Sequence, residues 1–155
     1  MMSQHEYRQH AEWTGNTGDG TTGYRDYERS VTVRVDGKAD LLASADKPFR
    51  GDPQRWNPED MLLSSLVSCH LLSYLHACVL AGVVVTAYTD DATGTMITEG
   101  NGGRFIEVVL RPRVTVTEAD MVDRAIAAHR DAHEWCFIAN SVNFPVRVEP
   151  EIVVA

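Results

Sequence analysis

The sequence has 155 residues, 44% of them hydrophobic and 23% charged, which excludes a disordered or fibrous protein and is enough for one domain with its own core. Its formal net charge of -8 argues against general nucleic-acid binding, because such binding needs a basic surface. No basic stretch followed by an apolar run stands near the N-terminus, so we expect no signal peptide.

Residues 1–56 predict short strands joined by polar loops. Strands are expected at residues 5–13, 30–35 and 39–43, with a tight turn at Asp36-Gly37 between the last two. The stretch 14–24 is rich in glycine and threonine and predicts a loop, and its glycines lack the spacing of a nucleotide-binding loop. Residues 46–56 contain two prolines and predict an irregular link.

A long apolar helix is expected between Asn57 and Gly82. Asn57 is a good N-cap, Pro58 suits the first helical position, and Gly82 suits the end. No Asp, Glu, Lys or Arg occurs from Met61 to Leu80. A helix that is apolar nearly all the way round needs protein on every side.

The same helix must also be weighed as a membrane span, because at ~1.5 Å per residue it is long enough to cross a bilayer. His70, His76 and the absence of flanking basic residues oppose that interpretation. Serines dilute the apolar surface further, at Ser64, Ser65, Ser68 and Ser73. Since strand patterns flank the helix on both sides, we expect no membrane contact.

Residues 83–155 predict further strands and a second helix. Strands are expected at residues 83–89, 94–98, 104–116 and 146–154, with Pro112 interrupting the third. The second helix is expected to begin after Thr117 as N-cap, with Asp120 in the capping-box position, and to end near Trp135. Its buried face is predicted to hold Met121, Ala125, Ala128 and Ala132. The order of elements predicts an α+β domain with a mostly antiparallel sheet.

Two of the three cysteines are candidates for redox chemistry. Cys69 lies near the middle of the long helix, where a cysteine usually packs as a small hydrophobe and needs a nearby cation to act as a nucleophile. Cys136 follows the second helix, and the two thiols would form a redox pair if they meet in space. Cys78 points to the opposite helical face from Cys69 and is assigned to packing. Three widely spaced cysteines favour free thiols in a reducing cytoplasm over a secreted disulfide framework.

The histidines offer a weaker alternative. His129 and His133 are four residues apart on the second helix with Cys136 one turn further, so these three residues are a candidate zinc-ligand set. The intervening glutamate of zinc proteases is missing, and we expect no metal site. His70 and His76 are expected to be hydrogen-bonded in the interior or to line an interface.

Two segments carry a family resemblance, NPEDMLLSSLVSC at residues 57–69 and AHRDAHEWC at residues 128–136. In this order and at this separation, the chain resembles the OsmC/Ohr family of osmotically inducible and organic hydroperoxide resistance proteins. The resemblance extends from the glycine-rich loop near Arg25 to the last strand. It implies an OsmC-like fold, in which a long central helix packs against a mostly antiparallel sheet, and an intertwined homodimer.

The resemblance implies a thiol peroxidase of organic hydroperoxides, acting in oxidative or osmotic stress defence. Cys69 matches the family's peroxidatic cysteine, and Cys136 matches the resolving cysteine that would form a disulfide with it. Many members have proline after the resolving cysteine, whereas this chain has Phe137. An external dithiol of the lipoyl type would reduce the disulfide, and no cofactor would be required. Apolar neighbours of Cys69 would favour organic hydroperoxides, namely Met61, Leu62, Leu66 and Phe137.

Two charged residues complete the implied site. Glu59 matches the carboxylate at the start of the helix, and Arg25 is assigned to the active-site arginine, with Arg50 and Arg55 as competing candidates. Glu59 and Cys69 are ten residues apart on one helix, ~15 Å along its axis, so they do not share a site within one chain. Two antiparallel helices would bring Glu59 of one subunit to Cys69 of the other. Glu59 would then orient Arg25, whose guanidinium stabilises the thiolate.

Two further functions stay open at the level of sequence. One is a binding or stress protein that keeps the OsmC fold but has little peroxidase activity, and the other is the zinc-binding module. Retention of both Cys69 and Cys136 favours the peroxidase, because a binding role requires neither thiol. The motifs do not separate the OsmC-like branch from the Ohr-like branch.

Overall fold

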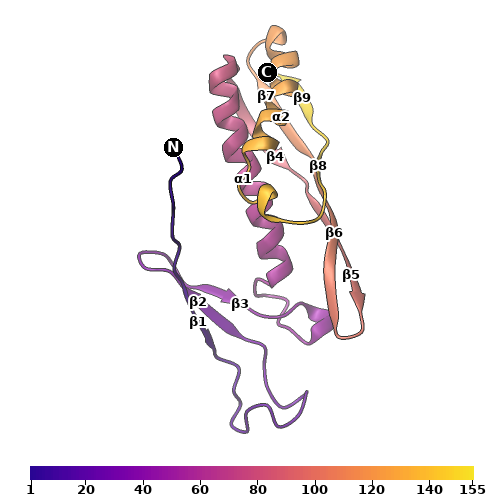
Figure 1. Ribbon diagram of the computed structural model, residues 1–155. Helices are drawn as coiled ribbons and strands as arrows, with labels where there is room; N and C mark the ends of the chain where they lie inside the picture. Colours follow the sequence, from indigo (N-terminus) through magenta and orange to yellow (C-terminus); the bar gives the residue numbers. More distant parts are fainter. The chain divides into compact units, whose positions relative to one another are not determined.

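The computed structural model describes residues 1–155 and has the predicted α+β composition of helices and strands (Figure 1). The chain divides into two compact units, residues 1–61 and residues 62–155. The single domain expected from the length of the chain stays a prediction.

The N-terminal unit contains one antiparallel sheet. Its strands are β1 (His10–Trp13), β2 (Val31–Arg34) and β3 (Leu41–Ala43), paired in that order. These positions confirm the three predicted strands within shorter bounds. The turn between β2 and β3 is confirmed as well, because Gly37 adopts a φ of 77°, which favours glycine. A 3-10 turn, η1 (Lys47–Phe49), lies in the link that follows.

The predicted long helix is confirmed as α1 (Pro58–Ala81). The Asn57 side chain caps it by accepting a hydrogen bond of 2.7 Å from the backbone N–H of Asp60, and Gly82 ends it with a φ of 65°. By length and composition α1 alone could cross a membrane, and 28% of its most apolar stretch is buried by the chain. That evidence is weak, because the core helix of a soluble protein has the same length and composition.

The C-terminal unit holds two three-stranded sheets. One sheet has the order β4-β7-β9, from strands β4 (Val85–Asp90), β7 (Pro112–Val116) and β9 (Glu151–Val154). The other has the order β5-β6-β8, from strands β5 (Thr93–Glu99), β6 (Gly102–Leu110) and β8 (Val146–Val148). Only β8 and β9 pair in parallel with their neighbours, so the prediction of mostly antiparallel pairing is confirmed.

Two predicted strands were wrong in their extent. The segment 104–116 divides into β6 and β7, and the segment 146–154 divides into β8 and β9, with the two halves in different sheets. Prolines lie at both divisions, Pro112 at the start of β7 and Pro150 before β9. Proline has no N–H for a strand ladder, and the N–H of Arg111 is taken by the Asp90 carboxylate at 2.7 Å.

The second helix, α2 (Val122–Trp135), is preceded by the 3-10 turn η2 (Ala119–Met121) and followed by η3 (Ala139–Ser141). The prediction of Thr117 as its N-cap was wrong. The N–H of Thr117 instead bonds to the carbonyl of Val84 at 3.2 Å, so this residue continues the strand pairing. The predicted inner face is confirmed, since Ala125, Ala128 and Ala132 are buried.

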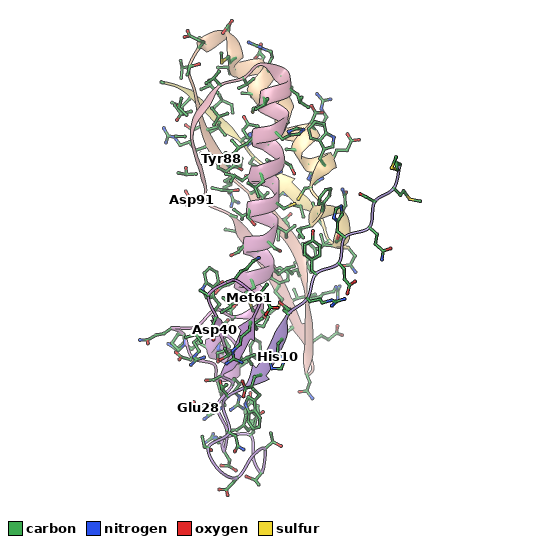
Figure 2. The ribbon with its side chains drawn as sticks, turned by 90° about the vertical axis from the view of Figure 1, so that its left-hand side faces the viewer. His10, Glu28, Asp40, Met61, Tyr88 and Asp91 are labelled. Atoms are coloured by element: carbon green, nitrogen blue, oxygen red, sulfur yellow. The ribbon has the colours of Figure 1, made fainter.

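The core of the C-terminal unit lies between α1, α2 and the β4-β7-β9 sheet. Alanines on α2 allow close approach, and the Tyr74 hydroxyl donates a hydrogen bond of 3.1 Å to the carbonyl of Ala125. Tyr88 of β4 packs beside α1, with its ring centre 5.8 Å from that of Tyr74 (Figure 2). A second cluster packs Leu66 of α1 against Val108 and Leu110 of β6. The buried side of α1 is thereby fixed, which turns Cys69 toward the other side.

Candidate active site

Cys69 lines a pocket of about 550 Å³ along α1. The pocket is walled by residues that recur at helical spacing on α1 and by two aromatic residues near the end of α2: Cys69, Leu72, Ser73, His76, Leu80, Trp135 and Phe137. The exposed fractions of Leu72 and Phe137 are 64% and 78%, so the wall is apolar and open. Such a surface can receive the hydrocarbon part of a small organic molecule beside the thiol.

Cys136 lies behind this pocket and is almost fully enclosed. It caps the end of α2 with an extended backbone, 1% of its surface is exposed, and its Sγ accepts a hydrogen bond from the N–H of Ala139 at 3.4 Å. The pKa of the Cys136 thiol is raised to about 11, chiefly by burial; the Ala139 N–H opposes this rise, and the Cys69 thiol contributes to it. Cys136 is therefore a neutral thiol at physiological pH.

The two thiols meet within the C-terminal unit. Cys69 lies on α1 and Cys136 directly follows α2, yet the two side chains are close enough for the Cys69 thiol to contribute to the raised pKa of Cys136. The spacing of the cysteines in the sequence did not show whether these two thiols are close in space. The pair is asymmetric, because Cys69 borders the pocket whereas Cys136 is enclosed. Cys78 packs in the core, where burial raises the pKa of its thiol, and its predicted packing role is confirmed.

The charged residues of the predicted site belong to the N-terminal unit. Arg25 and Arg50 line a separate recess of about 470 Å³, and Arg55 forms an ion pair with Asp52 at 3.6 Å. Glu59 lies in the first turn of α1, and its Oε2 is buried without a hydrogen-bond partner. An approach of Glu59 or of any of the three arginines to Cys69 stays a prediction.

The candidate zinc set is not assembled. His129 turns inward and its Nδ1 lies 3.0 Å from Nε2 of His70, while His133 is exposed and the Cys136 thiol is beside that of Cys69. No cluster of three or more His, Cys, Asp or Glu side chains suits a metal ion. The expectation that His70 is a hydrogen-bonded interior residue is confirmed, and His76 lines the Cys69 pocket.

Of the four apolar residues predicted to surround Cys69, Phe137 lines the pocket. Leu66 lies one turn before Cys69 and is fully buried against Val108 and Leu110. The pocket residues that were missed are Leu72, Leu80 and Trp135. Counting positions 3, 4, 7 and 11 after Cys69 along a helix would have found the stripe on α1.

A model of the OsmC-like protein family matches residues 51–151, a segment that holds α1 and both cysteines of the pair. The chain belongs to the OsmC-like family. The matched segment includes Glu59 but begins after Arg25 and Arg50. No curated protein matches the chain.

Solved structures agree with this OsmC-like assignment. An OsmC-like protein of unknown function from Vibrio cholerae is 31% identical, with a TM-score of 0.83 over 95% of this chain and 99% of that one. Organic hydroperoxide resistance proteins from Legionella pneumophila and Elizabethkingia anophelis are 17% and 18% identical, each with a TM-score of 0.69 over 99% of this chain and 100% of theirs. At such identities the latter two establish a common fold alone.

Proposed function

We propose that this OsmC-like protein is a thiol peroxidase that reduces organic hydroperoxides to alcohols. The observation that carries the proposal is the asymmetric thiol pair, in which Cys69 borders an open apolar pocket and the enclosed Cys136 lies beside it. A two-cysteine peroxidase needs one accessible thiol to meet the oxidant and a second to close a disulfide. The hydroperoxide resistance proteins that share the fold support the same chemistry.

The reaction begins with attack of the Cys69 thiolate on the distal oxygen of the hydroperoxide. The O–O bond breaks, the alcohol leaves after taking up a proton, and Cys69 becomes a sulfenic acid. The neutral thiol of Cys136 then condenses with the sulfenic acid, water is released, and a Cys69–Cys136 disulfide forms. The pairing is supported by the closeness of the two thiols, since the Cys69 thiol contributes to the raised pKa of Cys136.

The remaining requirements follow from this chemistry. An external dithiol of the lipoyl type restores both thiols by exchange with the disulfide, so the cycle uses no metal or organic cofactor. Three free cysteines suit a soluble protein of the reducing cytoplasm, where it would act in oxidative or osmotic stress defence. The apolar wall of Leu72, Leu80 and Trp135 favours organic over hydrogen peroxide.

The active unit is an intertwined homodimer. Outside the Cys69 pocket, α1 also exposes large apolar residues, with exposed fractions of 38% for Leu75 and 74% for Val79. A contiguous apolar stripe of this kind is expected to be covered in a soluble protein, and a second copy of α1 packed antiparallel would cover it. In that arrangement Glu59 of one subunit approaches Cys69 of the other, with Arg25 between them.

Replacing Glu59 with glutamine tests the site across the subunits. Loss of the carboxylate should slow oxidation of Cys69 by about 10- to 100-fold, because the arginine beside the thiolate loses the partner that orients it. Asp60→Asn is the matched control, since it removes an exposed carboxylate from the same helical turn. Stopped-flow oxidation of the reduced proteins gives the rates, and equal rates for Glu59→Gln and the wild type would remove Glu59 from the mechanism.

The activity itself is tested with the wild-type protein, reduced beforehand and mixed with cumene hydroperoxide and dihydrolipoamide. We expect peroxide consumption at least ~10³-fold above the reaction of the dithiol alone, with one alcohol formed per disulfide. Consumption no faster than the dithiol alone would reject the peroxidase. The alternative, an OsmC-fold binding or stress protein, would then be favoured, in keeping with the Vibrio relative whose function is unknown.

A further inference from the structure

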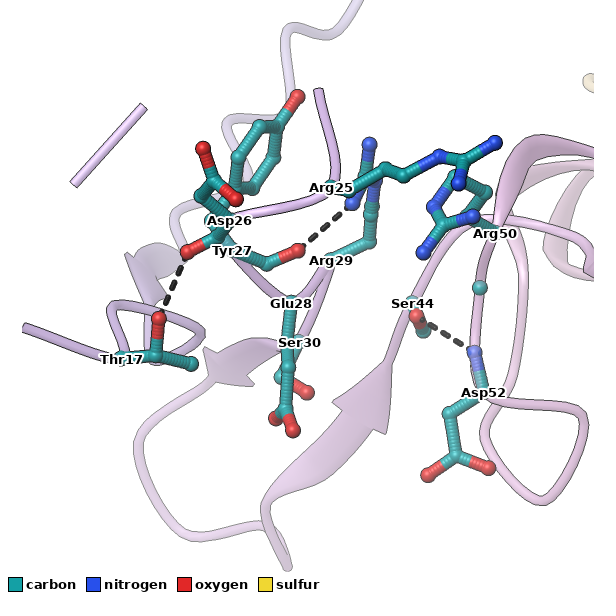
Figure 3. A pocket seen from close by; sticks show the side chains of 11 residues that line it. Thr17, Arg25, Asp26, Tyr27, Glu28, Arg29, Ser30, Ser44, Arg50 and Asp52 are labelled. Atoms are coloured by element: carbon teal, nitrogen blue, oxygen red, sulfur yellow. Dashed lines mark hydrogen bonds between the residues drawn. The ribbon is translucent and has the colours of Figure 1, made fainter. Parts of the chain in front are cut away.

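The N-terminal unit has a polar recess of about 470 Å³ that the peroxidase chemistry does not explain as a whole (Figure 3). Its wall comes from the loop before β2, the end of β3 and the link after η1. Three arginines line it, namely Arg25, Arg29 and Arg50, together with Ser30 and Ser44. The lining also contains three acidic residues, Asp26, Glu28 and Asp52, so the arginines are notable for their lack of carboxylate partners and not for an excess of positive charge.

None of the three guanidinium groups has a carboxylate partner. The ion pairs of the molecule involve other arginines, and Arg25, Arg29 and Arg50 take part in none of them. Arg29 is held between aromatic rings, 4.5 Å from the ring centre of Tyr24 and 4.0 Å from that of Tyr27, and donates a hydrogen bond to the Tyr27 carbonyl at 2.6 Å. These contacts fix the position of the Arg29 guanidinium group but do not neutralise its charge.

Asp26, Glu28 and Asp52 also line the recess, but none of them forms an ion pair with Arg25, Arg29 or Arg50. Asp52 pairs with Arg55 at 3.6 Å, and its backbone N–H donates to the Ser44 hydroxyl at 3.0 Å. Figure 3 shows the guanidinium groups on one side of the recess, with the carboxylates of Glu28 and Asp52 pointing to the opposite side. A bound anion would supply the charged partner that the three guanidinium groups lack.

The backbone at Arg50 supports a binding role. Arg50 has a φ of 63° and is the only residue other than glycine with a positive φ. Such a conformation disfavours a long side chain by ~1 kcal/mol, and here it forms the C-cap of η1, with the Arg50 N–H bonded to the Lys47 carbonyl at 3.0 Å. The adjoining Gly51 is fixed too, because an added Cβ would lie 1.5 Å from the carbonyl oxygen of Ala45. The loop therefore fixes the backbone from which the Arg50 side chain reaches the recess.

We propose that this recess binds an oxyanion, the carboxylate or phosphate group of a small acid, between Arg25 and Arg50. Arg29 supplies a fixed third charge, and the Ser44 hydroxyl, which accepts the N–H of Asp52, has its own proton to donate. Oxyanions suit this set because guanidinium groups bind them through paired, charge-assisted hydrogen bonds. Every residue of the recess belongs to the N-terminal unit, and Arg25 is also the arginine assigned to the proposed peroxidase site.

Calorimetric titration of the full-length Cys69→Ser protein with inorganic phosphate tests the site without interference from peroxidase chemistry. The key variant is Arg50→Asn, because asparagine tolerates a positive φ while the charge is removed. We expect it to weaken phosphate binding about 10-fold or more, the usual effect of losing a hydrogen bond between charged groups. Lys47→Met, which removes a cation from the same turn outside the recess, should leave the affinity unchanged.

Acetate and decanoate in the same titration distinguish the source of the anion. Binding of both carboxylates, with decanoate tighter, assigns the recess to an organic acid, and binding of phosphate alone assigns it to a phosphate group. In either case Arg50→Asn must remove the binding. Absence of binding up to about 10 mM, or equal affinities of Arg50→Asn and Lys47→Met, would overturn the proposal whether or not the protein is a peroxidase.

Discussion

The Cys69→Ser substitution should abolish hydroperoxide reduction, lowering the rate by ~10³-fold or more to that of the dithiol alone. A serine hydroxyl is a far weaker nucleophile than a thiolate, and it forms no sulfenic acid. The fold should be retained, because Cys69 borders an open pocket and no packed core. The measurement is consumption of cumene hydroperoxide in the presence of dihydrolipoamide.

The Cys136→Ser substitution should have a different effect, and this difference distinguishes the peroxidatic cysteine from the resolving cysteine. The first oxidation of Cys69 should proceed, but no neighbouring thiol can close the disulfide, so turnover stops after one equivalent of peroxide. Mass spectrometry should then find Cys69 heavier by about 16 Da as sulfenic acid and later by about 32 Da as sulfinic acid. The wild-type protein should instead lose two hydrogens and show a peptide joined through Cys69 and Cys136.

Cys78→Ala is the control for this pair of variants, because Cys78 packs in the core away from the pocket. Its peroxidase activity should equal that of the wild type. Continued turnover in Cys136→Ser would contradict the resolving role, and loss of activity in Cys78→Ala but retention in Cys69→Ser would mean that the wrong thiol has been assigned.

The long helix could be predicted to the residue because its signals are local. Asn57, Pro58 and Gly82 each act on the backbone within one turn, and no distant contact competes with them. The start of the second helix was not set by local signals in this way. Thr117 has a good N-cap side chain, but its hydroxyl donates to the Met121 sulfur at 3.6 Å instead of accepting a backbone N–H. The 3-10 turn η2 and then α2 begin after Thr117 without a side-chain cap.

An alternating sequence pattern does not show where a long predicted strand divides in two, because the division depends on the strands with which each half pairs. Residues 104–116 alternate continuously, yet β6 pairs with β5 and β8 whereas β7 pairs with β4 and β9. Pro112 marked the division, and its effect was underestimated as an interruption within one strand. A proline followed by a strand that pairs elsewhere is a sheet boundary, which becomes visible only once the partners are known.

The candidate site, too, could be predicted from the sequence only in part. The sequence identified Cys69 and Cys136, but their meeting required α2 to pack on α1 through Ala125, Ala128 and Ala132. The pocket wall beside Cys69 was predictable from helical spacing once one side of α1 was assigned to the core. Which of the three arginines approaches Cys69 could not be predicted, because it depends on how the N-terminal unit is placed relative to α1.

Acidification below pH 6.5 should destabilise the fold, because a buried histidine pair joins α1 to α2. Nε2 of His70 lies 3.0 Å from Nδ1 of His129, and their exposed fractions are 1% and 4%. The Tyr74 ring stacks on His129 with ring centres 3.8 Å apart, which closes the site further. His70 Nδ1 and His129 Nε2 are buried without partners, so an added proton finds no acceptor there.

The direction of the effect follows from the pKa values. Burial lowers the pKa of His70 from its usual 6.5 to about 4, with nearby His133 as a smaller cause. Burial lowers the pKa of His129 to about 3, and the adjoining His70 adds to the shift. Between these values and 6.5 the unfolded chain binds more protons than the folded protein. The stability is therefore fully present above pH 6.5 and is lost as the pH falls toward 4 and then 3.

Urea unfolding at about pH 7.5 and about pH 5 measures the loss, which we expect to be roughly 2–4 kcal/mol for the wild type at one fixed protein concentration. A His70→Leu/His129→Leu variant should lose much less, because both titrating groups are gone and no imidazole is left unpaired. His10→Ala, which removes an exposed histidine, should behave as the wild type. An equal loss in the double variant would contradict the assignment. Should that variant not fold, an NMR titration of the wild-type imidazoles decides, since a pKa near 6.5 for either His70 or His129 is incompatible with a buried neutral pair.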